Sequence, residues 1–347
     1  MLDVPQTCKI RTVTDLRKLI SEPPAMMRRR LQPRIDDHCM TVIRSASVCV
    51  VGFADQAGFA FINLRATPVI TVEADRVDLV WPAGLELPAA LARGEMLIGS
   101  LYFIMPGIGF ALRANGRSTA QQGEDGAARL AFQADAFFLH CSRAKVRAKF
   151  WEPRAGAPRS GEAGASVLSD AALAFVSRSP YLLLLTQDPA GKTELSPRGD
   201  PDGFVLALDP GTLLIPERPG NKVACTLTNI LAHEAVTVAF LIPGSPTVLI
   251  VDGRCWLTTE PSLLERVAVQ GKAPKLGMVL HVGEYRFQHS SALVEAGLWS
   301  NETHLRESDI PSFSKMLAEH MNGRGVLGKA TTLVVDAVVK HDLKHLY

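Results

Sequence analysis

The chain has 347 residues, of which 47% are hydrophobic and 6% aromatic, and its formal net charge is +2. This length is sufficient for two domains of ordinary size with an aliphatic core. The small net charge gives no reason to expect a nucleic-acid partner or a membrane surface. The polar segment from Met1 to Lys18 has no apolar core of a signal peptide, and no apolar run reaches the roughly 18 residues of a membrane span.

Six cysteines are scattered along the chain without a Cys-x-x-Cys pair. This pattern is typical of reduced thiols in a cytoplasmic protein, and it predicts neither a metal site nor a disulfide framework.

The first half of the chain begins with helical spacing and then changes to short strands. Residues 10–44 are predicted to be helical, with Arg28-Arg29-Arg30 on a solvated face. From Val48 to His140 the pattern is that of closely spaced strands and turns, followed by a helix from Ser142 to about Trp151. Residues 152–166 are rich in Gly, Pro, Ala and Ser, which predicts a linker.

The stretch from Ser196 to Lys222 organises the second half. Two short strands, 204–208 and 212–215, flank a turn, and an apolar pattern after Lys222 predicts a helix. Gly220-Asn221-Lys222 therefore lies at a strand-to-helix junction, where free backbone N–H groups suit a phosphate. Spacing alone favours a phosphate site and a solvated turn with ordinary surface cations equally.

The two halves repeat each other. Asn63 to Pro68 matches Ser196 to Pro201, and Asn115-Gly116-Arg117 matches Asp252-Gly253-Arg254, at offsets that only grow along the chain. Such offsets predict a diverged tandem duplication of a small antiparallel barrel, with the two copies packed as a pseudo-dimer.

This repeat divides the chain into four segments. They are a first barrel at 10–151, a linker at 152–166, a second barrel at 167–300 and a C-terminal extension at 301–347. In the extension, residues 310–321 are predicted to form a helix and 331–339 a helix or a strand, with no counterpart in the first copy.

Several short motifs together resemble one known family. In the second copy they are Ser-Pro-Arg-Gly-Asp at 196–200, Leu-Leu-Ile-Pro-Glu-Arg-Pro-Gly-Asn at 213–221, Asn229-Ile230-Leu231 and Pro243-Gly244. In the first copy they are Leu31 to Cys39, Leu112 to Arg117, and His140 to Lys145 with Arg147 and Trp151. The combination resembles the FMN-binding split-barrel proteins related to pyridoxamine 5'-phosphate oxidase. The resemblance implies a mainly β fold with helices, and FMN bound in a groove between two barrels that usually dimerise; it does not fix a substrate.

The two copies depart from this family in complementary places. Trp81-Pro82-Ala83-Gly84 stands in the first copy where the second has Ile215 to Lys222, so the first copy lacks the phosphate loop. The first copy has Arg113, Lys145 and Arg147. The second copy has no cation at the corresponding positions, which are occupied by Ile250, Leu293 and Glu295. The surviving halves can form one complete groove, which predicts one FMN per chain between the copies. The alternative is two decayed barrels without a cofactor.

The resemblance also assigns roles to residues. The phosphate would be held by Ser196, Arg198, Arg218, Asn221 and Lys222, and the electron-rich edge of the flavin ring would face Arg113, Lys145 and Arg147. For Arg147 an ordinary surface cation is an equal alternative. His140, Cys141 and His289 are interpreted as structural. No Ser-His-Asp, His-Glu-x-x-His or paired-carboxylate constellation identifies a catalytic residue.

Two function classes follow from the sequence. The first is an FMN-dependent oxidoreductase that acts on a small molecule, with no nucleic-acid or membrane partner, as a monomer with an internal pseudo-dimer or as a homodimer. The second is a non-catalytic or haem-binding split-barrel module, with His289 or His140 as an axial ligand.

Overall fold

A computed structural model of the protein describes residues 5–54, 58–67, 69, 71–123, 126–156 and 161–347. The first sheet contains β2 (Val48–Phe53), β3 (Gly58–Asn63), β4 (Thr71–Glu73), β5 (Arg76–Val80), β6 (Leu97–Ile104), β7 (Ala111–Gln122) and β8 (Ala128–His140). The second contains β10 (Tyr181–Gln187), β11 (Thr193–Gly199), β12 (Leu206–Asp209), β13 (Thr212–Pro216), β14 (Ala235–Leu241), β15 (Thr247–Thr258) and β16 (Gly277–His289), and the short strands β1 (Lys9–Ile10) and β9 (Ala163–Ala165) pair with it.

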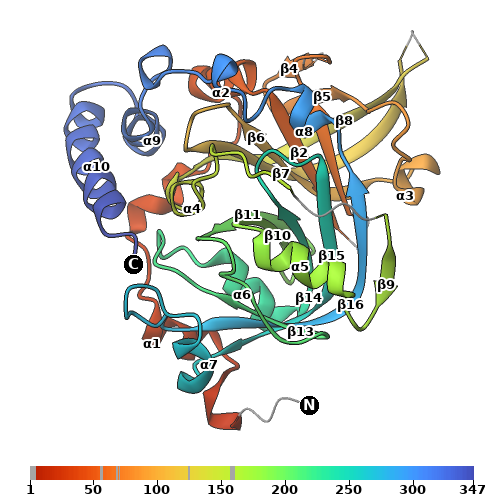
Figure 1. The fold of residues 1–347 in the computed structure, drawn as a ribbon. Coiled ribbons are helices and arrows are strands. Elements are labelled where there is room, and N and C mark those ends of the chain that lie inside the picture. Colours follow the sequence, from red (N-terminus) through yellow and green to blue (C-terminus); the bar gives the residue numbers. More distant parts are fainter. Residues whose placement is uncertain (1–4, 55–57, 68, 70, 124–125, 157–160) are drawn as a thin grey trace.

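Helices connect and cover the two sheets (Figure 1). The α-helices are α1 (Val13–Leu19), α2 (Asp37–Ser45), α3 (Ala89–Ala92), α4 (Arg143–Arg147), α5 (Asp170–Arg178), α6 (Cys225–Ala232), α7 (Pro261–Glu265), α8 (Ala292–Glu295), α9 (Phe313–Asn322) and α10 (Val326–Lys344). Four short segments are 3-10 helices, namely η1 (Gln6–Cys8), η2 (Ala25–Arg30), η3 (Asn301–Thr303) and η4 (Glu307–Asp309). Among these described helices, none combines the length and the apolarity that crossing a membrane requires.

The two sheets have the same strand order. The first runs β3-β2-β6-β7-β8-β5-β4, and the second runs β11-β10-β14-β15-β16-β13-β12. All named strand pairs are antiparallel, and each sheet curls over its own core (Figure 1). The predicted mainly β fold with helices and two barrel-like units is confirmed.

The two sheets also share a β-bulge at corresponding positions, so their strands pair in the same register. The pairing of β7 with β8 shifts at Asn115/Gly116, and the pairing of β15 with β16 shifts at Asp252/Gly253. A Cβ on Gly116 would lie 2.1 Å from the carbonyl oxygen of Gln133, and one on Gly253 would lie 2.2 Å from that of His281. Both bulges therefore require glycine, because the neighbouring strand passes too close for any side chain.

The apolar core of each barrel, together with a cluster shared by both sheets, explains why the central strands are hydrophobic on both faces. Along β2, Cys49 and Val51 point into the core of the first barrel, whereas Val48 and Val50 point into a cluster shared by both sheets. Leu183 of β10 reaches the same shared cluster from the second sheet. The two barrels thus pack through a continuous apolar interface, as expected when strands are buried on both faces.

Each end of the chain packs against the barrel that is more distant in the sequence: the N-terminal segment contacts the second barrel, and the C-terminal helix α9 contacts the first. At the N-terminus, β1 pairs with β15, and Leu16 of α1 lies in the core of the second barrel. We therefore propose that the first barrel begins after these residues, near Ala25. The helical stretch expected at 26–43, with an interruption near Pro33, is observed as the two helices η2 and α2. Pro33 lies between them and has no N–H group to donate.

The C-terminal extension lies against the first barrel. Met316, Leu317 and Met321 of α9 join its core, and α10 packs on α9 before the chain turns toward α4 (Figure 1). The helix expected at 310–321 corresponds to α9, and the segment at 331–339, expected as a helix or a strand, lies within the longer helix α10. The predicted linker lies in part outside the described residues, at 157–160, and it contains β9, which pairs with β16.

Candidate functional site

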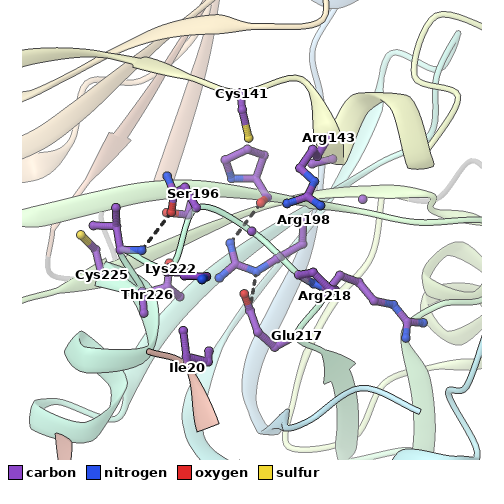
Figure 2. A pocket seen from close by; sticks show the side chains of 18 of the residues that line it. Ile20, Cys141, Arg143, Ser196, Arg198, Glu217, Arg218, Lys222, Cys225 and Thr226 are labelled. Atoms are coloured by element: carbon purple, nitrogen blue, oxygen red, sulfur yellow. Dashed lines mark hydrogen bonds and ion pairs between the residues drawn. The ribbon is translucent and has the colours of Figure 1, made fainter. Parts of the chain in front are cut away.

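A cavity of about 670 Å³ lies between the two barrels (Figure 2). It is lined by β7, β8 and α4 from the first barrel, by β11 and the loop after β13 from the second, and by the last residue of the chain. Seven of the eight residues predicted to bind a cofactor line it, and they are Arg113, Arg147, Ser196, Arg198, Arg218, Asn221 and Lys222. The phosphate-loop residues of the second barrel and the late basic residues Arg113 and Arg147 of the first barrel therefore line the same cavity.

The charge of this cavity is strongly unbalanced. Among its described lining residues, nine side chains are basic and two are acidic. The two acids, Glu194 and Glu217, are paired with Arg113 and Arg198 respectively. Arg218 and Arg143 are paired as well, with Asp200 and Asp342, which lie outside the lining. The other five cations produce a positive potential inside a concave site, which favours an anionic ligand, and they are Arg30, Arg147, Lys222, Lys272 and Lys275.

The segment from Gly220 to Thr226 forms the predicted junction of loop and helix. Lys222 and Ala224 both have left-handed backbone angles, with φ of 64° and 60°. Arg17 of α1 fixes this bend, because its guanidinium donates to the carbonyl oxygens of Lys222 and Val223 at 2.9 and 3.1 Å. The bend leaves α6 without a side-chain cap at its first turn. Its N-terminus, which carries free N–H groups and a partial positive charge, lines the cavity.

Beside this helix start, Arg198 of β11 extends across the cavity toward Glu217 (Figure 2). Its Nε donates to the carboxylate of Glu217 at 2.9 Å, and its Nη1 donates to the carbonyl of Pro197 at 3.0 Å. Lys222 is exposed, and the carboxamide oxygen of Asn221 accepts from the backbone N–H of Val223 at 3.1 Å. The Lys222 amine is thus available to a ligand, whereas Asn221 already shapes the loop.

Arg218 differs from these residues because it is already engaged. Its Nε donates to Asp200 at 2.6 Å, and its Nη2 donates to the carbonyl of Val267 at 2.8 Å. Asp200 is completely buried and also accepts a 2.6 Å hydrogen bond from the hydroxyl of Tyr347. Burial, and then the hydrogen bond to Asp200, raise the pKa of Tyr347 to about 12. Arg218 therefore belongs to a buried ion pair at the wall of the cavity.

On the opposite wall, Arg113 of β7 joins the two barrels. Its guanidinium pairs with Glu194, donates to the hydroxyl of Ser196 at 3.2 Å and lies 4.5 Å from the centre of the Phe138 ring. Its Nη1 is also 3.4 Å from Nδ1 of His140. Burial, and then the charge of Arg113, hold the pKa of His140 well below its ordinary value, so this ring is neutral.

Lys145 is the one predicted residue that does not line the cavity. Arg143 and Arg147 are four residues apart on α4 and face the cavity, so Lys145, midway between them, points to the other side of the helix. Its amine is buried, 5.3 Å from the Trp151 ring centre and 3.4 Å from the carbonyl of Ile108. Burial lowers its pKa to about 7. Lys145 therefore lies outside the cavity that the other seven predicted residues line, and its contact with a flavin ring stays a prediction.

Arg147 contacts the end of the chain. Its guanidinium donates to the carbonyl oxygens of Leu346 at 2.8 Å and of Pro219 at 2.7 Å. Burial, and then the charge of Arg143, lower the pKa of Arg147. Arg143 in turn donates to the carbonyl of His345 at 3.1 Å. These two arginines hold the C-terminal segment against the cavity, so Arg147 is not a solvated surface cation.

Sequence reasoning missed several residues of this cavity. Arg30 was expected on a solvated face, but it is only 9% exposed and lines the cavity close to Phe138. Cys225 and Thr226 at the start of α6, and Tyr347 at the end of the chain, also line it. Charge and the helix signal could have indicated Arg30 and Thr226, but no local pattern connects Tyr347 to residues more than a hundred positions away.

The corresponding place on the other side of the pseudo-dimer is apolar. Ile250 and Leu293, which match Arg113 and Lys145, are fully buried in the cluster between the barrels. Phe61, which matches Glu194, lies in the same cluster. His289 is exposed at the end of β16 and does not line the cavity, whereas His140 does. The two grooves therefore differ in the chemistry of the side chains that fill them.

Residues 168–289 match the sequence profile of the pyridoxamine 5'-phosphate oxidase family. Solved structures with similarity include HupZ of Group A Streptococcus, at 19% identity over 33% of this chain and 89% of that one, with a TM-score of 0.28. A Clostridium acetobutylicum protein of the pyridoxinephosphate oxidase family, related to general stress protein 26 of B. subtilis, is 9% identical over 32% of this chain and 80% of that one, with a TM-score of 0.24. MrkH of K. pneumonia is 11% identical over 78% of this chain and 93% of that one, with a TM-score of 0.20.

No curated protein matches the chain. The family is assigned to residues 168–289 from the sequence match alone. That match spans the second barrel, with its phosphate-loop segment, and it leaves the first barrel unmatched.

Proposed function

Since the second barrel is a pyridoxamine 5'-phosphate oxidase-like split barrel, we propose that the protein binds one FMN between its barrels. We further propose that it is an FMN-dependent oxidoreductase acting on a small molecule. The observation that supports this most directly is the cavity itself, which gathers seven of the eight residues that the resemblance marks for FMN.

The residues of the cavity fit a phosphate-bearing flavin. Its volume of about 670 Å³ is in the ordinary range for a small-molecule or cofactor site. The excess of basic side chains requires an anion to balance it, and the uncapped start of α6 offers backbone donors of the kind that phosphates accept. An FMN phosphate would meet both conditions.

The phosphate would be held by Lys222, by Arg198 and by the N–H groups at the start of α6. Each would contribute a charge-assisted hydrogen bond, and the arginine offers paired donors. Because Arg218 is already bound to Asp200 and to a carbonyl oxygen, we propose that it positions the loop, with its remaining nitrogen available to the phosphate.

The flavin ring would lie toward Arg113. When bound, FMN supplies electron-transfer chemistry, and a fixed positive charge near the ring favours its reduced, negatively charged form. Arg113 carries such a charge, partly offset by its ion pair with Glu194, and Glu194 and Ser196 hold its guanidinium rigidly. The neutral His140 beside it can accept or donate a hydrogen bond without adding charge. Arg143 and Arg147 would position the C-terminal segment, which excludes water from this side of the cavity.

The shared strand order and the matching bulges support a tandem duplication as the origin of the two barrels. Relatives that dimerise form the groove from two chains. Here the two barrels already pack through a common apolar cluster, so we propose that a single chain is sufficient to bind FMN.

The test is to purify the protein, record its absorption spectrum and titrate the apoprotein with FMN and with riboflavin, which has no phosphate. We expect one FMN per chain. The variant Lys222→Gln removes one charge-assisted contact, so FMN affinity should fall about tenfold or more while riboflavin affinity changes little.

Lys192→Gln, at an exposed lysine outside the cavity, is the matched control and should leave both affinities unchanged. A colourless protein that takes up neither flavin contradicts the proposal. Equal losses for FMN and riboflavin in Lys222→Gln would show that this lysine maintains the loop and does not contact a phosphate.

A further inference from the structure

Outside the lining of this cavity, a second group of polar side chains joins the first barrel to the C-terminal extension. Asp36 is the N-cap of α2, Cys39 lies in its first turn, and His320 lies on α9. One ligating atom from each of these residues lies within 4.8 Å of the others. The three residues come from two helices that are distant in the sequence.

His320 is buried without hydrogen bonds. Its side chain has no exposed surface, and neither ring nitrogen has a hydrogen-bond partner. Its Nε2 nevertheless lies 2.9 Å from a carboxylate oxygen of Asp36. Nδ1 thus has no polar partner, and Nε2 has only this ion-pair contact with Asp36. An unpaired polar atom on a buried imidazole is costly, and in a native protein it calls for an explanation such as an ion. Two ligands of one metal ion also approach each other closely, because both direct lone pairs at the ion.

The orientation of Asp36 fits the same explanation. One carboxylate oxygen accepts the backbone N–H of Cys39 at 2.8 Å, and the other faces His320. This arrangement holds the second oxygen in place as a neighbouring hydrogen bond does for many metal-binding carboxylates. His38 next to it is paired with Glu319 at 2.7 Å, so the surroundings of the cluster are fixed by a further contact between α2 and α9.

We propose that Asp36, Cys39 and His320 form a binding site for a divalent transition-metal ion, Zn²⁺ being the best match. Zinc combines thiolate, imidazole and carboxylate ligands, with bonds of about 2.0–2.3 Å that place the ligand atoms roughly 3–4 Å apart. Small side-chain adjustments bring the three atoms, which now lie 2.9 Å (His320 to Asp36) and within 4.8 Å of one another, to these distances. The carboxylate of Asp36 is 38% exposed, which leaves a path for the ion and a position for a water ligand. Burial raises the pKa of the Cys39 thiol, and coordination would supply the charge that stabilises its thiolate.

The site would fasten the C-terminal extension to the first barrel. Cys39 belongs to the core of that barrel, and α9 contributes Met316 and Met321 to the same core. Because α10 follows α9 and leads to Tyr347 in the main cavity, a metal at this place would also hold the wall of that cavity. The cysteine spacing in the sequence gave no sign of it, because its ligands are separated by nearly the whole chain.

The experiment uses the full chain, stripped of metal with a chelator and then titrated with Zn²⁺ and with Co²⁺. We expect one Zn²⁺ per chain, a rise in the unfolding temperature when it binds, and slower proteolysis of the C-terminal segment. Co²⁺ should produce the near-ultraviolet absorption band of a thiolate–cobalt bond, because Cys39 is a ligand.

Cys39→Ser and His320→Gln should each weaken Zn²⁺ binding by at least a hundredfold, and Cys39→Ser should abolish the thiolate band. Cys255→Ser, at an equally buried cysteine of the second barrel, should change neither. The absence of the thiolate band in the unaltered protein overturns the proposal, whatever the stability of the variants. Zn²⁺ uptake that persists undiminished in both ligand variants overturns it as well.

Discussion

Arg218 offers the sharpest separation of a structural role from a ligand-binding role. We expect Arg218→Met to destabilise the folded protein strongly, whether or not FMN is present. Asp200 has no exposed surface and lies 2.6 Å from the Arg218 guanidinium, whose side chain is 6% exposed. Removal of one partner leaves an uncompensated charge in the interior, which typically costs about 3–5 kcal/mol. The Tyr347 hydroxyl remains bound to Asp200, so we expect a loss of about 3 kcal/mol.

The measurement is urea unfolding of the apoprotein, followed by tryptophan fluorescence. Arg254→Met is the matched control, because Arg254 pairs with Glu234 at 2.9 Å but both side chains are more than half exposed. Such a surface pair contributes about 1 kcal/mol or less. The double variant Arg218→Met with Asp200→Asn should recover part of the loss, since no charge is then left buried. Similar losses in Arg218→Met and Arg254→Met would refute the assignment of Arg218 to a buried ion pair.

Two further variants test the packing around the site. The folded protein binds a proton on Lys145 only below about pH 7, whereas the unfolded chain does so up to its ordinary pKa of 10.5. Stability should therefore rise with pH between these values, by up to about 1.4 kcal/mol per unit, and Lys145→Met should remove this dependence in urea unfolding at several pH values; an identical slope in the variant would contradict the burial of the amine. Gly116→Ala should lower stability by about 1–3 kcal/mol, because its Cβ would meet a backbone oxygen at 2.1 Å, whereas Gly161→Ala, with open space around it, should have little effect; equal unfolding midpoints for these two variants would exclude a close approach at the bulge.

Much of the fold could be predicted from the sequence because it is recorded in local patterns. The repeat of Asn115-Gly116-Arg117 as Asp252-Gly253-Arg254 marks the same bulge in both sheets, where only glycine fits. The loop-to-helix junction after Lys222 can also be predicted from neighbouring residues, because a turn is followed there by an apolar helical pattern. The likeness of the two strand orders follows from such signals, because the two halves carry the same pattern in the same order.

The complementary halves of the site were also evident in the sequence. Arg113 survives in one copy, and Lys222 survives in the other. Both line one cavity in the folded protein, because pairwise packing of the barrels brings the late strands of one copy against the loop of the other.

What only the tertiary structure decided is which of these side chains are free and which are already paired. Arg218 and Lys222 look alike as loop cations, but a buried Asp200 engages the first and leaves the second exposed. The direction of Lys145 depends on how a short helix rests on its sheet. The approach of His320 to Asp36 and the return of Tyr347 to the cavity depend on where the C-terminal helices dock. Such contacts join residues that are far apart in the chain. No short-range sequence pattern encodes them, because they form only when the whole molecule packs.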